Sequence, residues 1–150
     1  MQQQPTARFS RPRTRVATLA IATLAFLAIA MPAQGATSSK RVAKQAQNAT
    51  LGKTILTTLA GRTLYTLSAE TKGTFICKGG CLTAWHPLYV AVGVKPTGPV
   101  KLGTIKRPDN GRRQVTFRGR PLYTFDGDER AGDANGEGFK DVGTWHAAAP

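Results

Sequence analysis

Two cysteines, Cys77 and Cys81, are the chain's clearest candidates for covalent chemistry. In an oxidising compartment an isolated pair usually forms a disulfide. Gly79 and Gly80 allow the three intervening residues to turn sharply, and so short a loop stabilises by only about 2 kcal/mol. The alternative is a redox or metal role, but thioredoxin-like sites have two residues between their cysteines. We therefore expect a structural disulfide.

The chain has two histidines, His86 and His146, and each directly follows a tryptophan, Trp85 or Trp145. His86 and the two cysteines would supply three metal ligands, whereas a closed zinc site takes four. A disulfide would also remove two of those three ligands. We expect the histidines to pack against neighbours or lie on a strand surface.

Six of the eight acidic residues fall between positions 126 and 141, in a glycine-rich stretch. Carboxylate oxygens on such a loop could hold calcium, with Asp126, Asp128 and Asp133 as candidates, but their spacing does not follow the twelve-residue calcium loop. We favour a solvated loop with no cofactor, whose acids balance nearby arginines. Those arginines are Arg118, Arg120 and Arg130.

The sequence contains none of the common catalytic motifs: no Gly-x-Ser-x-Gly, no phosphate-binding glycine loop and no His-Glu-x-x-His. The crowded carboxylates are candidates for acid–base catalysis in a small hydrolase. A flexible loop, however, lacks the rigid positioning that such chemistry needs. We expect the protein not to be an enzyme.

The elements that would position these residues are short strands joined by tight turns. From Leu51 onward, runs of β-branched and aromatic residues alternate with Gly, Pro, Asp and Asn. The strands predicted are 52–58, 63–67, 86–92, 102–106, 113–117, 121–125 and 144–148. Asn110-Gly111 predicts a hairpin turn, and residues 127–143 predict a loop. The expected fold is an all-β, antiparallel domain.

The strand-forming region contains an internal repeat. Residues 61–67 match residues 119–125 at five of seven positions, and the Trp-His pair at 85–86 recurs at 145–146. Two matches in the same order at nearly the same offset indicate a duplicated unit. We place the copies at about 51–92 and 102–148. Each is too small to bury its own apolar face, so they should share a core.

The N-terminus has the pattern of a secretory signal. Four arginines are followed by an uncharged run at 16–30 and then by small residues, which predicts a signal peptide over 1–35. The run is shorter than the roughly 20 residues of a membrane span, the alternative being a retained anchor. No cysteine lies nearby for lipid attachment. Residues 36–50 are polar and small and predict a flexible linker before the domain at 51–150.

The charge of the chain restricts its partners. Loss of residues 1–35 removes four arginines and no acid, so the net charge falls from +13 to +9. Outside a cell, anionic envelope polymers and lipid headgroups are the expected partners. Export takes the protein away from nucleic acid, which we do not expect it to bind. The composition contains no signal for an oligomeric state.

Residues 123–128 fit the pattern Tyr-x-(Phe/Trp/Tyr)-x-x-Asp through Tyr123, Phe125 and Asp128. On this motif, and on further matches between about residues 50 and 148, the chain resembles a bacterial family of secreted repeats and predicted lipoproteins. The resemblance implies an extracytoplasmic, duplicated β domain of unassigned activity. The first copy departs from the motif, with Tyr65 retained but Leu for the second aromatic and Glu70 for the acid.

The motif residues have an architectural interpretation. We expect Asp128 to accept hydrogen bonds from backbone amides of its own turn. Tyr123 and Phe125 should point to the same sheet face. The sequence thus predicts an exported, non-enzymatic envelope-binding or structural domain. The alternative is a metal-binding or redox accessory protein that uses the cysteine pair or the acidic loop.

Overall fold

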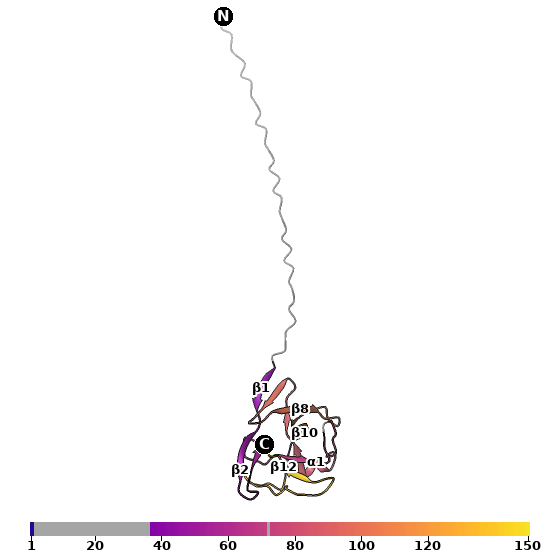
Figure 1. Ribbon diagram of the computed structural model, residues 1–150. Coiled ribbons are helices and arrows are strands. Elements are labelled where there is room, and N and C mark those ends of the chain that lie inside the picture. Colours follow the sequence, from indigo (N-terminus) through magenta and orange to yellow (C-terminus); the bar gives the residue numbers. More distant parts are fainter. Residues whose placement is uncertain (2–36, 72) are drawn as a thin grey trace. The chain divides into compact units, whose positions relative to one another are not determined.

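The computed structural model describes Met1, residues 37–71 and residues 73–150. Apart from Met1, the predicted signal peptide over 1–35 lies outside the described residues. The described part is all-β, which confirms the expected fold class, and its single helix has four residues (Figure 1). No helix within it has the length and hydropathy needed to span a bilayer.

Twelve strands and one helix make up the described chain. In chain order they are β1 (Ser38–Arg41), β2 (Lys44–Asn48), β3 (Lys53–Thr57), β4 (Tyr65–Leu67), α1 (Cys81–Ala84), β5 (Trp85–Pro87), β6 (Tyr89–Val90), β7 (Val94–Thr97), β8 (Leu102–Lys106), β9 (Arg113–Phe117), β10 (Arg120–Pro121), β11 (Tyr123–Phe125) and β12 (Trp145–Ala147).

The two copies exchange strands in a central antiparallel sheet of order β12-β4-β11-β5. Strand β4 of the first copy pairs with β12 of the second, and β11 of the second copy pairs with β5 of the first. The two inner strands meet at Tyr65 opposite Tyr123. The copies are therefore related by a pseudo-twofold axis near this tyrosine pair, which supports a shared core.

Each copy also contributes one hairpin. In the second copy β8 pairs with β9 from Leu102↔Phe117 to Lys106↔Arg113. In the first copy β2 pairs with β3 over the same number of residues, from Lys44↔Thr57 to Asn48↔Lys53. Strand β2 is thus the counterpart of β8, and the first copy begins at β2 rather than at residue 51.

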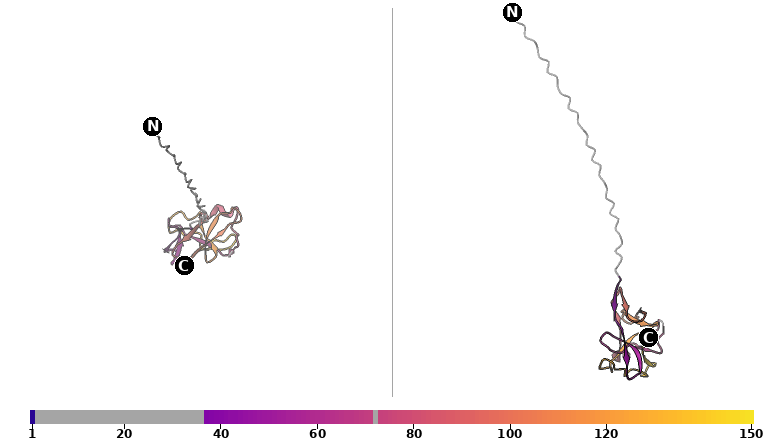
Figure 2. Two further views of the ribbon diagram at one scale, coloured as in Figure 1. Left: turned by 90° about the horizontal axis from the view of Figure 1, so that it is seen from above. Right: turned by 60° about the vertical axis from the view of Figure 1, so that its left-hand side comes forward.

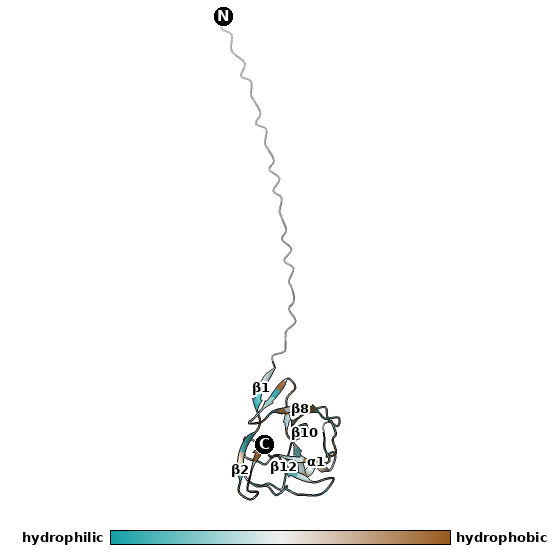
Figure 3. Ribbon diagram, viewed as in Figure 1, coloured by the Kyte–Doolittle hydropathy of each residue, from teal (hydrophilic) through white to brown (hydrophobic). Residues whose placement is uncertain are grey.

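The prediction of a flexible linker over 36–50 is therefore wrong. Strands β1 and β2 occupy most of it, and Val42 and Ala43 between them are buried in the core. Strand β1 is exposed and polar, and it is held by parallel pairing with β7 (Figures 2 and 3). Main-chain hydrogen bonds hold this segment in place, and they require no apolar composition.

Two predicted strands are each divided between two sheets. The segment 86–92 separates at Leu88 into β5 and β6, and the segment 121–125 separates at Leu122 into β10 and β11. These two leucines lie at crossovers joined by the hydrogen bond from the Leu88 amide to the Leu122 carbonyl, 2.9 Å. The predicted turn at Asn110-Gly111 forms, with Gly111 at positive φ, and further turns at 60–61 and 118–119 place Gly61 and Gly119 at positive φ.

The core consists of two clusters of buried side chains. One lies between the hairpins and contains Leu56, Leu64, Val115 and Leu122 among others. The other is built on the central sheet around the repeated tyrosines and tryptophans. The second cluster contains all the buried motif tyrosines, so the candidate site begins there.

Candidate functional site

The motif tyrosines and acids form two buried pairs that cross between the copies. The Tyr65 hydroxyl donates to Asp128 Oδ2 at 2.8 Å, and the Tyr123 hydroxyl donates to Glu70 Oε2 at 2.9 Å. All four side chains are buried. Glu70 therefore takes the place of an aspartate in the first copy. The amide that Asp128 accepts is that of Asn135, seven residues on and outside its own turn.

Burial dominates the electrostatics of these pairs. It raises the pKa of Glu70, against the opposing hydrogen bonds from the Cys77 and Ile76 amides and from Tyr123. Burial likewise raises the pKa of Asp128, against the hydrogen bonds from Tyr65 and the Asn135 amide. The phenol pKa values of Tyr65 and Tyr123 are also raised by burial, so both hydroxyls stay protonated and donate.

Two repeat-equivalent arginines cross in the same way. The Arg62 guanidinium donates to the Phe125 carbonyl at 2.7 Å. Its counterpart Arg120 donates to the carbonyls of Leu67, Ser68 and Glu70 at 3.0–3.3 Å. Each arginine therefore caps the end of the other copy's tyrosine strand. Arg120 was expected to balance loop acids, but its partners are carbonyl oxygens.

The repeat-equivalent tryptophans stack on each other at the pseudo-twofold axis. The ring centroids of Trp85 and Trp145 are 3.7 Å apart and nearly parallel. Tyr65 packs edge-on to Trp85 and Tyr123 edge-on to Trp145, at 5.4 and 5.1 Å. Phe125 stacks on Trp85 at 4.3 Å, so Tyr123 and Phe125 contribute to one apolar cluster, as expected for one sheet face.

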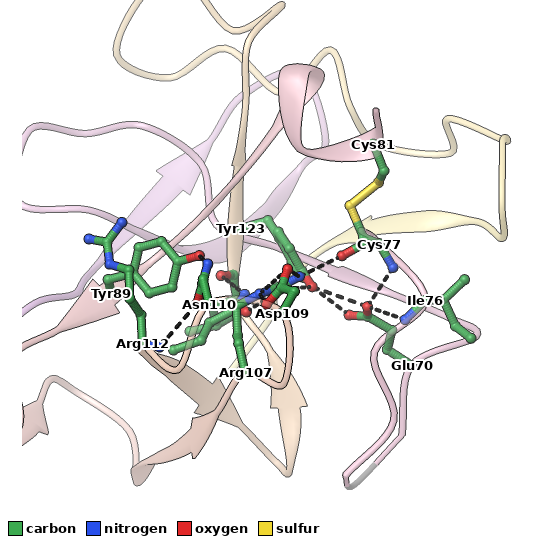
Figure 4. A network of polar contacts seen from close by, with 12 residues as sticks. Glu70, Ile76, Cys77, Cys81, Tyr89, Arg107, Asp109, Asn110, Arg112 and Tyr123 are labelled. Atoms are coloured by element: carbon green, nitrogen blue, oxygen red, sulfur yellow. Dashed lines mark hydrogen bonds and ion pairs between the residues drawn. A yellow bond between two sulfur atoms is a disulfide. The ribbon is translucent and has the colours of Figure 1, made fainter. Parts of the chain in front are cut away.

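Arg107 organises a polar network in the second copy's hairpin turn (Figure 4). Its guanidinium has no exposed surface and donates to Asp109, to Gln114 and to the Cys77 carbonyl at 2.8–2.9 Å, and to Tyr123 at 3.2 Å. Burial alone would lower the pKa of Arg107, but the hydrogen bonds to Asp109 and Tyr123 outweigh it. In return, Arg107 lowers the pKa of Asp109. Neither the internal repeat at 61–67 and 119–125 nor the Tyr-x-(Phe/Trp/Tyr)-x-x-Asp motif includes this arginine.

The predicted disulfide is confirmed. Cys77 and Cys81 are bonded, with their Cα atoms 5.3 Å apart, and the described residues contain no free cysteine. Cys77 is buried in the tryptophan cluster. Its amide donates to Glu70 and its carbonyl accepts from Arg107, so the disulfide is part of the polar network around Tyr123.

Both histidines lie on strand surfaces and pair with loop acids. His86 Nε2 is 3.4 Å from Asp126 Oδ1, and His146 Nδ1 is 3.1 Å from Glu137 Oε1. Glu137 also accepts from the Ala147 amide at 2.8 Å and lies 3.5 Å from Lys53. Burial would raise the pKa of Glu137, but these contacts lower it. The ion-pair partners of Asp126 and Glu137 are therefore the two histidines and Lys53, and not the arginines expected from the sequence.

The calcium candidates do not converge. Asp128 is buried against Tyr65, Asp126 is exposed beside His86, and Asp133 accepts from the Arg130 amide at 2.8 Å. In the described part of the chain, no group of three His, Cys, Asp or Glu side chains is arranged to hold a metal ion. Residues 127–143 form the expected loop, and the three candidate carboxylates make separate contacts.

The surface carries four adjoining concavities, of about 670, 540, 310 and 260 Å³, that share lining residues. The largest of the four lies beside Tyr89 and Arg112, at the turn of the second hairpin. None of the described residues that line these four concavities is acidic, and eight are cationic. The eight cations are Lys40, Lys95, Lys101, Lys106, Arg112, Arg113, Arg118 and Arg120. We call this surface the concave face.

The second copy is similar to a known family. Residues 103–149 match the family described as a secreted repeat of unknown function. Tyr123, Phe125 and Asp128 fall within the matched range, and the match supports an extracytoplasmic protein of unassigned activity. It covers the second copy alone, whereas the resemblance noted above extends from about residue 50. Neither a curated protein nor a solved structure matches the chain.

Proposed function

We propose that this protein is a non-enzymatic, extracytoplasmic binding domain that holds anionic polymers of the cell envelope on its concave face. The observation that supports the proposal is the separation of charge. Eight cations line the concave face, without an acidic residue among its described lining. A surface adapted only for solubility would intersperse both signs.

The positions of the acids favour the same function. Six lie in the stretch 126–141, and the other two, Glu70 and Asp109, bind Tyr123 and Arg107. None of them neutralises the concave face. A polyanion that binds there would release counterions and meet focused positive potential, so binding should weaken steeply with salt.

The location of the titratable groups supports a function without catalysis. Groups with strongly shifted pKa values mark active sites when they line a cleft. Here Tyr65, Glu70, Tyr123 and Asp128 are enclosed in the core and line none of the four concavities. Their shared role is to join the two copies.

The test compares two charge-reversal variants of the exported protein. Lys95, Lys101 and Lys106 on the concave face are exposed and are changed to Glu in one variant. Lys78, Arg130 and Lys140, exposed elsewhere, are changed to Glu in the control. Both lose the same net charge. We expect the first to bind isolated envelope material about ten-fold or more weakly and the control about two-fold. Equal losses, or binding that ignores salt, would contradict the proposal.

A further inference from the structure

In the largest cleft of the concave face, three lining side chains contact one another at one corner. The Arg112 guanidinium lies over the Tyr89 ring at 3.6 Å. Asn110 Nδ2 donates to the Tyr89 hydroxyl at 2.9 Å, and the Arg112 amide donates to Asn110 Oδ1 at 3.0 Å. Ring, amide and guanidinium thus hold one another in place (Figure 4). We call these three residues the Tyr89 corner.

The Tyr89 corner is also anchored from inside the protein. It sits on the β8–β9 turn, whose Asp109 is held by the buried Arg107 through hydrogen bonds of 2.9 Å to both carboxylate oxygens. The Gly111 amide donates to the Arg107 carbonyl at 3.0 Å, with Gly111 at φ 70°. The hairpin tip is therefore rigid before any ligand arrives, and a fixed side chain loses little entropy on binding.

Arg112 is available to an incoming anion. Its side chain is exposed, and no described carboxylate lies within ion-pair distance of it. A guanidinium stacked on a ring still presents its N–H edges, which match two oxygens of a phosphodiester or carboxylate. The neighbouring cations Lys40 and Lys106 sit on flexible stems and supply charge without that geometry.

The lining of the same cleft is partly apolar. Val90, Val92 and Val94 line it, and Val92 is 82% exposed. Aliphatic side chains next to a tyrosine ring offer contact to the C–H groups of a sugar or polyol, which a bare inorganic polyanion does not have. The cleft therefore joins a fixed oxyanion receptor to a surface suited to a carbon chain.

We infer that the Tyr89 corner binds one oxyanion of an anionic glycopolymer whose sugar or polyol backbone lies along Val90, Val92 and Val94. The inference rests on the proposed function and names its ligand class. Arg112 is the residue that distinguishes an oxyanion in the right orientation from charge in general.

The experiment measures dissociation constants of the exported protein for poly(glycerol phosphate) and for polygalacturonate. Arg112→Lys keeps the charge and removes the planar fork. Arg118→Lys is the matched control, because Arg118 is also exposed on the concave face and lies over a ring, Phe117, at 4.7 Å. We expect R112K to weaken binding about ten-fold and R118K less than two-fold. A second variant, Tyr89→Leu, should match R112K.

The outcomes separate the two claims. If the wild-type protein binds neither polymer, the proposed function and the inference both fail. If it binds and R112K equals R118K, the proposed function stands and the Tyr89 corner is overturned as a receptor. Sensitivity to R112K with poly(glycerol phosphate) assigns a phosphodiester oxyanion, and with polygalacturonate a carboxylate.

Two further arms test the carbon backbone. Inorganic polyphosphate should bind more weakly than poly(glycerol phosphate) of equal charge, since it makes no contact with the valines. Equal or tighter binding would overturn that part of the inference. Phosphatidylglycerol vesicles should also bind more weakly than the polymers, and a preference for vesicles that is lost in Val92→Asp would assign a lipid surface instead.

Discussion

The two copies of the repeat share a backbone plan and differ in how they secure the segment between the tyrosine strand and the tryptophan strand. In the first copy, residues 68–84 carry the Cys77–Cys81 disulfide. In the second, residues 126–144 form the acidic loop, tied by polar contacts such as that from Trp145 Nε1 to Asp141 at 3.0 Å. The same strand arrangement is therefore compatible with a segment held by a disulfide and with one held by non-covalent contacts.

The two copies also differ in the side chains that stabilise their hairpin turns. The second copy's turn contains the buried Arg107, which reaches the Tyr123–Glu70 pair. The first copy's turn uses Asn48, whose side chain accepts from the Leu51 amide and donates to the Gly132 carbonyl, both at 2.8 Å. The duplicated sheet preserves the fold, while the turns have diverged, and the turn with Arg107 is the one that supports the concave face.

The largest effect should come from removing the buried arginine of the second copy's hairpin turn, compared with an arginine of the first copy that makes a single carbonyl contact. Arg107→Met leaves Asp109 without its partner and breaks a buried network, so we expect a loss of about 3 kcal/mol in the free energy of unfolding. Arg62→Met removes a hydrogen bond to one carbonyl and should cost about 1 kcal/mol. Urea unfolding measures both. Equal losses would show that the Arg107 network adds nothing to the second hairpin.

The disulfide offers the next test. Cys77→Ala with Cys81→Ala should lower the free energy of unfolding by about 2 kcal/mol, because the closed loop is short. The chain should keep its sheet signal in circular dichroism, since the second copy's loop folds without a disulfide. Loss of the folded state altogether would mean that the first copy cannot hold its segment by polar contacts as the second does.

The crossed tyrosines should respond unequally to Phe. Tyr65→Phe leaves buried Asp128 with the Asn135 amide alone and should cost about 2 kcal/mol, whereas Tyr123→Phe leaves Glu70 with two amides and should cost about 1 kcal/mol. Both are measured by urea unfolding at pH 7. The opposite order would show that Arg107 relies on the Tyr123 hydroxyl more than Glu70 does.

The smallest effect concerns Glu137, which lies in the second copy and pairs with His146 and Lys53. Its folded pKa is lowered, so its contribution is present above the ordinary glutamate pKa of about 4.3 and is lost as pH falls through the lowered value. Glu137→Gln should therefore be less stable than wild type at pH 6 by under about 1 kcal/mol. The gap should close below pH 4, and thermal melts across that range test it. A constant gap would exclude a charge effect.

Much of the fold could be predicted from the sequence because its strands are apolar and its turns carry glycine. Strands β8 and β9 and the Asn110-Gly111 turn follow from local chemistry. Strand β2 could not, since Lys44–Asn48 has one apolar residue where its counterpart β8 has two. An edge strand held by main-chain bonds requires no apolar pattern.

The residues of the candidate site could be predicted from the sequence, but which of them contact one another could not. Repetition marked both tyrosines and both tryptophans, and a residue near a twofold axis meets its own copy, as Trp85 meets Trp145. Spacing within one copy cannot tell whether the Tyr65 hydroxyl meets Glu70 or Asp128, because both acids follow the same local pattern. The choice is made by strand exchange, a tertiary property.

Strand exchange also sets the order of events in folding. Strand β4 gains its outer neighbour from β12, which lies almost at the end of the chain, and the Trp85 ring gains its stacking partner from the same segment. Contacts so distant in sequence close slowly, and neither copy can complete its sheet until the other has been synthesised. We therefore expect the two copies to fold as one cooperative unit, and neither to persist as a folded domain without the other.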